Sequence, residues 1–285
     1  MTIQDLLSQT IHILGDHDDA RFDAVCLIED FARIPRGTIE LQRESVVSET
    51  AKNAVIEAAQ RRANGYPLQY LLGNWDFLDL TLSVGEGVLI PRPETELLCE
   101  TAAAEIARFP KEKDPIVVWD LCGGSGCIGL GVSSLVGSRR LQVTEIELSD
   151  EALFYLQKNT KRYPQYFIRT VKADILLDFD RFTDGVDVIL SNPPYIKTED
   201  LATLQTEVQH EPMMALDGDR DGLRFYRAIA DHWIPKLRSG GFAAVEIGIG
   251  QSEDVVALFP AAGLDTVTCL NDFAGIGRVV IGHKP

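Results

Sequence analysis

The feature that most constrains the fold is a regular alternation of strand-like and helix-like segments from Pro115 to the C-terminus. This alternation is typical of a doubly wound, mostly parallel α/β sheet that is covered by helices on both faces. No helix separates the last two predicted strands, so we expect them to form an antiparallel hairpin at one edge. Apolar runs predict strands at residues 116–119, 141–148, 168–171, 186–191, 241–247, 265–270 and 278–281, and helical periodicity predicts helices at 128–135, 150–159, 223–237 and 252–259.

The residues before this region have a different pattern. Apolar residues recur at helical spacing over residues 3–62, with a break near Pro35. Apolar residues then alternate over 77–90 on both sides of a Gly-Glu-Gly segment at 85–87, which predicts a β-hairpin that turns there. We therefore expect a small helical domain for substrate recognition at residues 1–72, a β-hairpin linker at 73–95 and the α/β domain at 96–285.

The composition disfavours several classes of function. The 43 acidic residues outnumber the 27 basic ones, and the formal net charge of −16 opposes binding to nucleic-acid phosphates. The five cysteines form no C-x-x-C pair, and no histidine has a second one three or four residues away, so we expect no metal site. No run of about 18 apolar residues and no secretion signal occurs. We expect a cytoplasmic monomer that binds neither a membrane nor, directly, nucleic acid.

A glycine-rich loop follows the first strand of the α/β domain. Glycines in such a loop let the backbone pass close to a bound nucleoside. A carboxylate about 20 residues later, at the end of the second strand, typically accepts hydrogen bonds from the ribose. Glu147 lies nearer the carboxyl end of that strand and is our choice, with Glu145 left open as the alternative. The candidate nucleoside-binding residues are Cys122, Gly123, Gly124, Ser125, Gly126, Glu147, Asp174 for the adenine amine and Ile175 for its ring.

The tetrapeptide Asn192-Pro193-Pro194-Tyr195 follows the strand predicted at 186–191. The two prolines restrict the backbone, so the Pro193 carbonyl is held in one direction. Together with the Asn192 side-chain oxygen it offers two acceptors for both hydrogens of a planar –NH₂ group. Such preorganisation can orient a weakly nucleophilic nitrogen without a strong base, and Tyr195 can pack on the flat group.

Several segments together resemble the release-factor glutamine methyltransferases, the PrmC/HemK family. The resemblance covers nearly the whole chain. It is carried by GYPLQYLLG at 65–73, IPRPETE at 90–96, the glycine loop, residues 147–159, NPPY at 192–195, and the motifs at 211–216 and 221–223. NPPY alone also occurs in enzymes that methylate adenine or guanine, whereas IPRPETE combined with NPPY is much more specific.

The resemblance implies a Rossmann-like class I methyltransferase domain that uses S-adenosylmethionine. Its implied substrate is the glutamine of the Gly-Gly-Gln motif in class 1 peptide-chain release factors, a protein partner that the acidic surface suits. Asn192 would contact both cofactor and substrate, Asn192, Pro193 and Tyr195 would be catalytic, and residues 192–195 including Pro194 would hold the glutamine. Two positions depart from the family pattern, because Cys122 replaces a usual glycine and Glu147 a usual aspartate.

Other functions stay open from the sequence alone. The alternatives are glutamine methylation of a ribosomal protein, methylation of an exocyclic amine of adenine or guanine in nucleic acid, and an inactive cofactor-binding protein, for which Cys122 is the hint. For Arg92 and Glu94, an interdomain brace and direct substrate contact are both open.

Overall fold

The computed structural model describes residues 1–15, 19–110, 112–137 and 140–285, and the chain divides into two compact units. We call Met1–Asn74 with Gln205–His210 the N-terminal unit, and Trp75–Leu204 with Glu211–Pro285 the sheet unit. Among the described residues, no helix combines the length and the apolar character that a membrane span requires.

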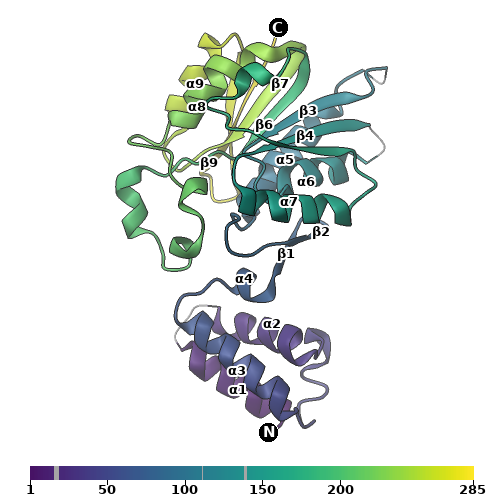
Figure 1. Ribbon diagram of the computed structural model, residues 1–285, viewed down its shortest axis with the longest axis vertical. Coiled ribbons are helices and arrows are strands. Elements are labelled where there is room, and N and C mark those ends of the chain that lie inside the picture. The colour runs from purple at the N-terminus through teal and green to yellow at the C-terminus, as the bar shows by residue number, and fades with distance from the viewer. Residues whose placement is uncertain (16–18, 111, 138–139) are drawn as a thin grey trace. The chain divides into compact units, whose positions relative to one another are not determined.

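The N-terminal unit is a small helical bundle, as the sequence predicts. The capping box of Thr2 and Asp5 starts its first helix, and Ser48 caps the third. Apolar side chains at helical spacing, such as Leu6, Leu27 and Val55, are fully buried between the helices. The helices are α1 (Ile3–Leu14), α2 (Ala20–Ala32), α3 (Glu49–Ala63) and α4 (Leu68–Leu72), coloured purple to blue in Figure 1.

A short segment from much later in the chain completes this bundle. Arg62 of α3 is buried and donates to Asp23 Oδ2 at 2.7 Å and to Glu207 Oε1 at 2.8 Å. The rings of Tyr66 and His210 pack edge to face, 5.3 Å apart. A buried guanidinium requires such partners, because an uncompensated charge is strongly destabilising inside a protein. Residues 205–210 therefore belong structurally to the N-terminal unit.

The sheet unit is built on a seven-stranded sheet with the order β5-β4-β3-β6-β7-β9-β8. The pairs from β5 to β7 are parallel, and β9 is antiparallel to both β7 and β8, which confirms the predicted terminal hairpin. The strands are β3 (Ile116–Leu121), β4 (Leu141–Glu147), β5 (Ile168–Lys172), β6 (Val186–Ser191), β7 (Leu237–Glu246), β8 (Asp265–Asn271) and β9 (Gly277–His283).

Helices cover both faces of this sheet, so the predicted doubly wound architecture is confirmed. Figure 1 shows α5, α6 and α7 together on one face and α8 and α9 on the other. Leu98 and Ile128 bury the first face, and Tyr226, Trp233 and Phe259 bury the second. The helices are α5 (Pro93–Ile106), α6 (Cys127–Val136), α7 (Asp150–Arg162), α8 (Arg224–Ala228), which continues as helical turns to Lys236, and α9 (Ser252–Ala261).

The predicted β-hairpin exists, but its predicted turn is wrong. The strands are β1 (Asn74–Phe77) and β2 (Leu80–Ser83), so the turn lies at Leu78 and Asp79, with Leu78 at φ +52°. Gly85 and Gly87 instead permit close contacts with α7. A Cβ on Gly85 would lie 2.0 Å from the Tyr155 hydroxyl oxygen, and one on Gly87 would lie 2.5 Å from the Glu151 Cβ. The sheet unit begins at Trp75 and includes most of the segment expected as a linker.

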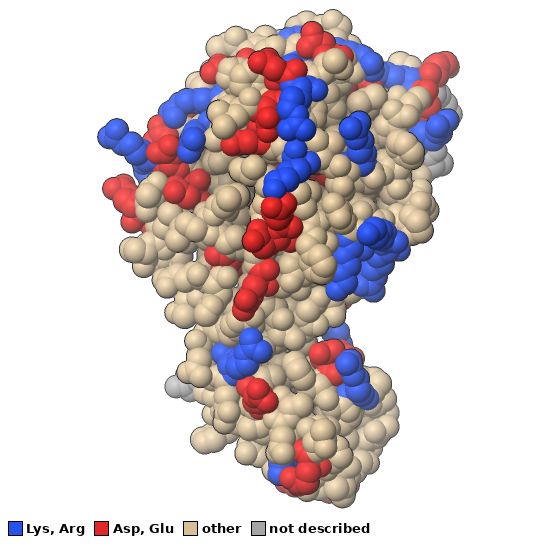
Figure 2. Space-filling view, in the orientation of Figure 1, with Lys and Arg blue, Asp and Glu red and all other residues tan. Residues whose placement is uncertain are grey.

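Acidic and basic side chains are interspersed on the surface that Figure 2 presents. Ion pairs between exposed side chains include Arg227 with Asp221 and Lys172 with Asp150. Exposed ion pairs of this kind contribute little stability each.

Candidate active site

A cavity of about 330 Å³ lies at the carboxyl ends of β3, β4, β5 and β6, where ligands bind in open α/β sheets. Seven of the residues selected from the sequence line it: Cys122, Gly124, Glu147, Asp174, Ile175, Asn192 and Pro194. Five others adjoin the wall without being part of it: Gly123, Ser125, Gly126, Pro193 and Tyr195. Sequence reasoning assigned no role in the site to other wall residues, among them Gly87, Leu89, Ser149, Met214 and Phe225.

The glycine loop leads from β3 into α6 beside this cavity. Cys122, Gly124 and Gly126 all have positive φ, at +66°, +56° and +80°. A Cβ on Gly124 would meet only the Cys122 carbonyl oxygen, at 3.9 Å, so the glycine leaves open space at the wall. Cys122 adopts a left-handed backbone conformation that residues other than glycine rarely adopt. Burial raises the pKa of its thiol well above the usual value, so the thiol is neutral.

Glu147 ends β4 and reaches the cavity wall. Its Oε2 accepts from the backbone N–H of Gly124 at 2.8 Å, and its Oε1 accepts from the N–H groups of Leu148 and Ser149, each at 2.8 Å. Burial raises the pKa of Glu147, while these three hydrogen bonds oppose the shift. The carboxylate thus joins the glycine loop to the start of α7, and Oε2, which accepts one hydrogen bond, retains a lone pair for a ligand.

Glu145, the alternative to Glu147, lies elsewhere. It is fully buried under the glycine loop, where a Cβ on Gly129 would meet its Oε1 at 1.9 Å and one on Gly123 its Oε2 at 2.7 Å. Its partner across the strand pair is Asp120, also fully buried. Burial raises the pKa of Asp120 to about 7 and that of Glu145 well above its usual value. At least one of the two groups is therefore neutral at neutral pH, because two adjacent buried carboxyls cannot both ionise.

Asp174 and Ile175 follow β5 on the opposite wall. Asp174 Oδ1 accepts from the N–H of Leu176 at 2.8 Å, and the N–H of Asp174 donates to Asp178 Oδ2 at 2.8 Å. Ile175 is 3% exposed, and its carbonyl accepts from Trp233 Nε1 at 2.9 Å. The wall here combines a carboxylate with an apolar surface, and hydrogen bonds hold both residues in place.

The NPPY segment begins where β6 ends. The Ser191 hydroxyl donates to the Leu121 carbonyl and fastens the end of β6 to β3. Asn192 Nδ2 donates to Thr95 Oγ1 at 3.2 Å. Burial raises the pKa of Tyr195 to about 12, so its hydroxyl is protonated. The segment thus presents Asn192 and Pro194 to the cavity from a backbone that is anchored on both sides.

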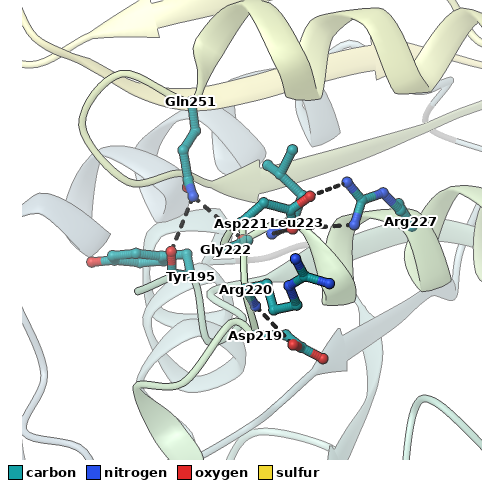
Figure 3. A network of polar contacts seen from close by, with 8 residues as sticks. All are labelled: Tyr195, Asp219, Arg220, Asp221, Gly222, Leu223, Arg227 and Gln251. Carbon is teal, nitrogen blue, oxygen red and sulfur yellow. Dashed lines mark hydrogen bonds and ion pairs between the residues drawn. The ribbon is translucent and has the colours of Figure 1, made fainter. Parts of the chain in front are cut away.

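Gln251 holds the far side of this segment (Figure 3). Its Nε2 donates to the carbonyls of Tyr195 at 3.0 Å and Gly222 at 3.3 Å, and its Oε1 accepts from the N–H of Gly248 at 2.9 Å. A Cβ on Gly222 would lie 2.4 Å from the Tyr195 carbonyl oxygen, and one on Gly218 would lie 2.7 Å from the Tyr195 Cα. Only glycine permits this approach, so the loop at 217–223 packs directly on the NPPY backbone.

The IPRPETE segment is tied into the sheet unit. Arg92 forms an ion pair with the buried Glu211, whose Oε2 also accepts from the N–H of Ile90 at 3.0 Å. Glu94 lies 3.8 Å from Arg278 Nη2. Arg92 therefore braces two segments of one unit, 90–92 and 211, which corrects the interpretation of an interdomain brace.

Comparison with known structures defines the fold class. The chain is similar to the catalytic domain of hMettl16 in complex with MAT2A 3'UTR hairpin 6, with a TM-score of 0.57 and 16% identity over 80% of this chain and 82% of that chain. The same domain in complex with hairpin 1 gives a TM-score of 0.55 at 14% identity. The sheet unit has the Rossmann-like class I methyltransferase fold.

Sequence comparison identifies the family. Residues 5–73 match the PrmC N-terminal domain, and residues 91–219 match Conserved hypothetical protein 95. The release factor glutamine methyltransferase of Thermodesulfovibrio yellowstonii is 34% identical over 88% of each chain. That of Clostridium botulinum is 32% identical over 100% of each chain. The chain belongs to the release factor glutamine methyltransferase family.

Proposed function

We propose that this protein transfers a methyl group from S-adenosylmethionine to the side-chain amide nitrogen of the glutamine in the Gly-Gly-Gln motif of class 1 release factors. The observation that carries the proposal is the position of Asn192 and Pro194 on the wall of the cavity, next to residues suited to a nucleoside. Membership of the family supports the choice of glutamine. The proposal places the protein in the cytoplasm, where translation termination occurs.

The residues of the cavity fit the cofactor. Glu147 offers its Oε2 to a ribose hydroxyl, and Asp174 offers an acceptor for the adenine amine. Ile175 supplies an apolar surface for the ring, and Gly124 leaves the open space that a nucleoside needs. In our proposal the loop from Cys122 to Gly126 and Asn192 complete the cofactor site. When bound, S-adenosylmethionine supplies a methyl group made electrophilic by its sulfonium.

The chain's own residues orient the amide. The Asn192 side-chain oxygen and the Pro193 carbonyl accept the two hydrogens of the glutamine –NH₂ group, which directs the nitrogen lone pair toward the cofactor side of the cavity. The rigid Pro193-Pro194 backbone maintains this geometry, so positioning and electrostatics lower the barrier. The nitrogen gains the methyl group as the bond between that group and the sulfonium sulfur breaks, and it loses one hydrogen as a proton to solvent. Tyr195 supports the segment through its buried ring.

The N-terminal unit is the proposed site of release-factor recognition. The match of residues 5–73 to the PrmC N-terminal domain supports this assignment. The acidic net charge of −16 suits a protein substrate better than a phosphate backbone.

Mass spectrometry of a class 1 release factor incubated with the protein and S-adenosylmethionine tests the proposal. We expect one added methyl group on the peptide that contains Gly-Gly-Gln, and none when its glutamine is replaced by alanine. Methylation that survives this replacement, or that appears on ribosomal protein or nucleic acid instead, would contradict it.

A further inference from the structure

Two buried side chains form a hydrogen-bonded chain that ends on Asn192. Thr95, in the first turn of α5, and Glu246, the last residue of β7, are each 1% exposed. The Thr95 hydroxyl donates to Glu246 Oε2 at 2.6 Å, and Asn192 Nδ2 donates to Thr95 Oγ1 at 3.2 Å. Of these three residues, Asn192 lines the cavity, and Thr95 and Glu246 do not. Any influence of Thr95 and Glu246 on the cavity therefore passes through the Asn192 amide.

The chemistry of these groups sets the direction of the hydrogen bonds. An ionised carboxylate only accepts, and a hydroxyl has a single hydrogen to donate. When Thr95 donates to Glu246, its lone pairs remain for Asn192, so the end of the amide that faces Thr95 must be the nitrogen. The amide oxygen is then at the opposite end. A flipped amide would present N–H groups to the N–H groups of the substrate, and two donors do not bond.

We infer that Thr95 and Glu246 are positioning residues that set which end of the Asn192 amide faces the substrate. This inference rests on the function proposed above, in which the Asn192 oxygen accepts one hydrogen of the glutamine –NH₂ group. An asparagine amide is nearly symmetric in shape, so packing alone selects its orientation weakly. Hydrogen bonding to a buried acceptor selects it strongly, because a mismatched pair leaves polar groups unsatisfied.

We call the hydrogen-bonded series from Glu246 through Thr95 to Asn192 the relay. Its hydrogen-bond directions depend on the ionisation of Glu246. Burial raises the pKa of Glu246 to about 7, and the hydrogen bond from Thr95 opposes this shift. A neutral Glu246 can donate to Thr95, which frees the threonine hydroxyl to point at Asn192. The charged and titratable groups near Glu246 are Arg92 and Glu94 at the start of α5, Arg278 on β9, Tyr195 after β6, Tyr226 on α8 and the thiols of Cys99 and Cys127.

Kinetics of variants test the relay with the full-length protein and a release factor. Thr95→Val removes the hydroxyl but keeps the shape, and we expect kcat to fall about tenfold, the effect of one oriented hydrogen bond. Thr95→Ser should restore the rate. Glu246→Gln should have a low kcat that no longer falls as the pH decreases below 7. Ser133→Ala is the matched control, because it removes a buried hydroxyl that donates to the Gly129 carbonyl within α6.

A structural role alone would not produce this pattern. Calorimetry of wild type and Thr95→Val should show a smaller change in S-adenosylmethionine affinity than in kcat, since the amide oxygen that Thr95 positions faces the substrate. A kcat of Thr95→Val equal to that of Ser133→Ala would overturn the inference. So would a pH profile of Glu246→Gln identical to that of the wild type.

A spectroscopic measurement tests the relay without any substrate. The chain has six asparagines, so ¹⁵N-asparagine labelling gives few side-chain amide signals, and Asn192→Ala identifies the one of interest. We expect this signal in the wild type to shift with a midpoint near pH 7, the pKa of Glu246, and to lose the shift in Glu246→Gln. A signal that does not respond to pH would refute the relay even if the release factor is methylated. A signal that responds while no release factor is methylated would support the relay and contradict only the proposed function.

Discussion

Cys122 permits a direct test of the backbone geometry of the glycine loop. Its φ of +66° lies in the left-handed region, which costs an L-residue about 1–2 kcal/mol. Glycine avoids this cost but loses about 0.5–1 kcal/mol relative to alanine through its greater freedom in the unfolded chain. We therefore expect Cys122→Gly to be more stable than Cys122→Ala, by roughly 0.5–1 kcal/mol. Both variants remove the thiol, so the comparison isolates the backbone.

Cys99 provides the control, because it is a buried cysteine in the middle of α5. Glycine is less favourable than alanine by about 1 kcal/mol inside a helix, so Cys99→Gly should be less stable than Cys99→Ala. The order of the two variants is thus reversed between the two cysteines.

Thermal or urea unfolding followed by circular dichroism measures both pairs. A difference of 1 kcal/mol corresponds to about 2–4 °C in Tm for a chain of this size. A Cys122→Gly variant that melts below Cys122→Ala would refute the left-handed conformation at this position. Finding the same order of stability for the glycine and alanine variants at Cys122 and at Cys99 would also refute it.

Three further predictions concern the site. Asn192→Ala should lower kcat by at least about 100-fold, since it removes a preorganised polar group. Single-turnover methylation of a release factor measures this rate, and an unchanged kcat would exclude the assigned role. Burial raises the pKa of Asp120 to about 7, above its unfolded value, so the stability contributed by its neutral form is lost as the pH rises through 7. Glu145→Gln offers Asp120 a hydrogen-bond donor, and we expect a smaller loss of Tm between pH 5.5 and 8 than in the wild type; equal losses would contradict the influence of Glu145 on the ionisation of Asp120. Gln251→Ala leaves three backbone groups without their partner. We expect it to lower the free energy of unfolding, measured in urea, by about 2 kcal/mol. A change below about 0.5 kcal/mol would show that water replaces the amide.

Local sequence pattern was sufficient to predict the sheet, because each strand and helix has its own hydrophobic period. It failed at residues 85–87, where a Gly-Glu-Gly segment is as typical of a hairpin turn as of a close contact. The deciding contacts are with Tyr155 and Glu151, about 70 residues later in the chain, and no local signal shows them.

The candidate site likewise contains residues that local sequence pattern predicts and residues that it misses. Gly124, Glu147 and Asn192, which line the cavity, were selected from the sequence because each follows a predicted strand at its carboxyl end. Thr95 and Glu246 were not found, although Thr95 lies within IPRPETE, because their hydrogen bond joins residues 151 positions apart. Sequence position alone also could not distinguish Glu145 from Glu147, which share one face of β4. The glycine loop distinguishes them, since it covers Glu145 and hydrogen-bonds Glu147.

The return of residues 205–210 to the N-terminal unit has a consequence for dissecting the protein. A fragment cut after Asn74 would contain Asp23 and Arg62 but would lack Glu207, and it would contain Tyr66 without His210. The surface of the fragment would differ from that of the intact N-terminal unit at the place that residues 205–210 occupy. Binding measured with such a fragment would therefore report on an incomplete N-terminal unit, and the proposed role of this unit in recognition should be mapped by point substitutions in the full-length chain.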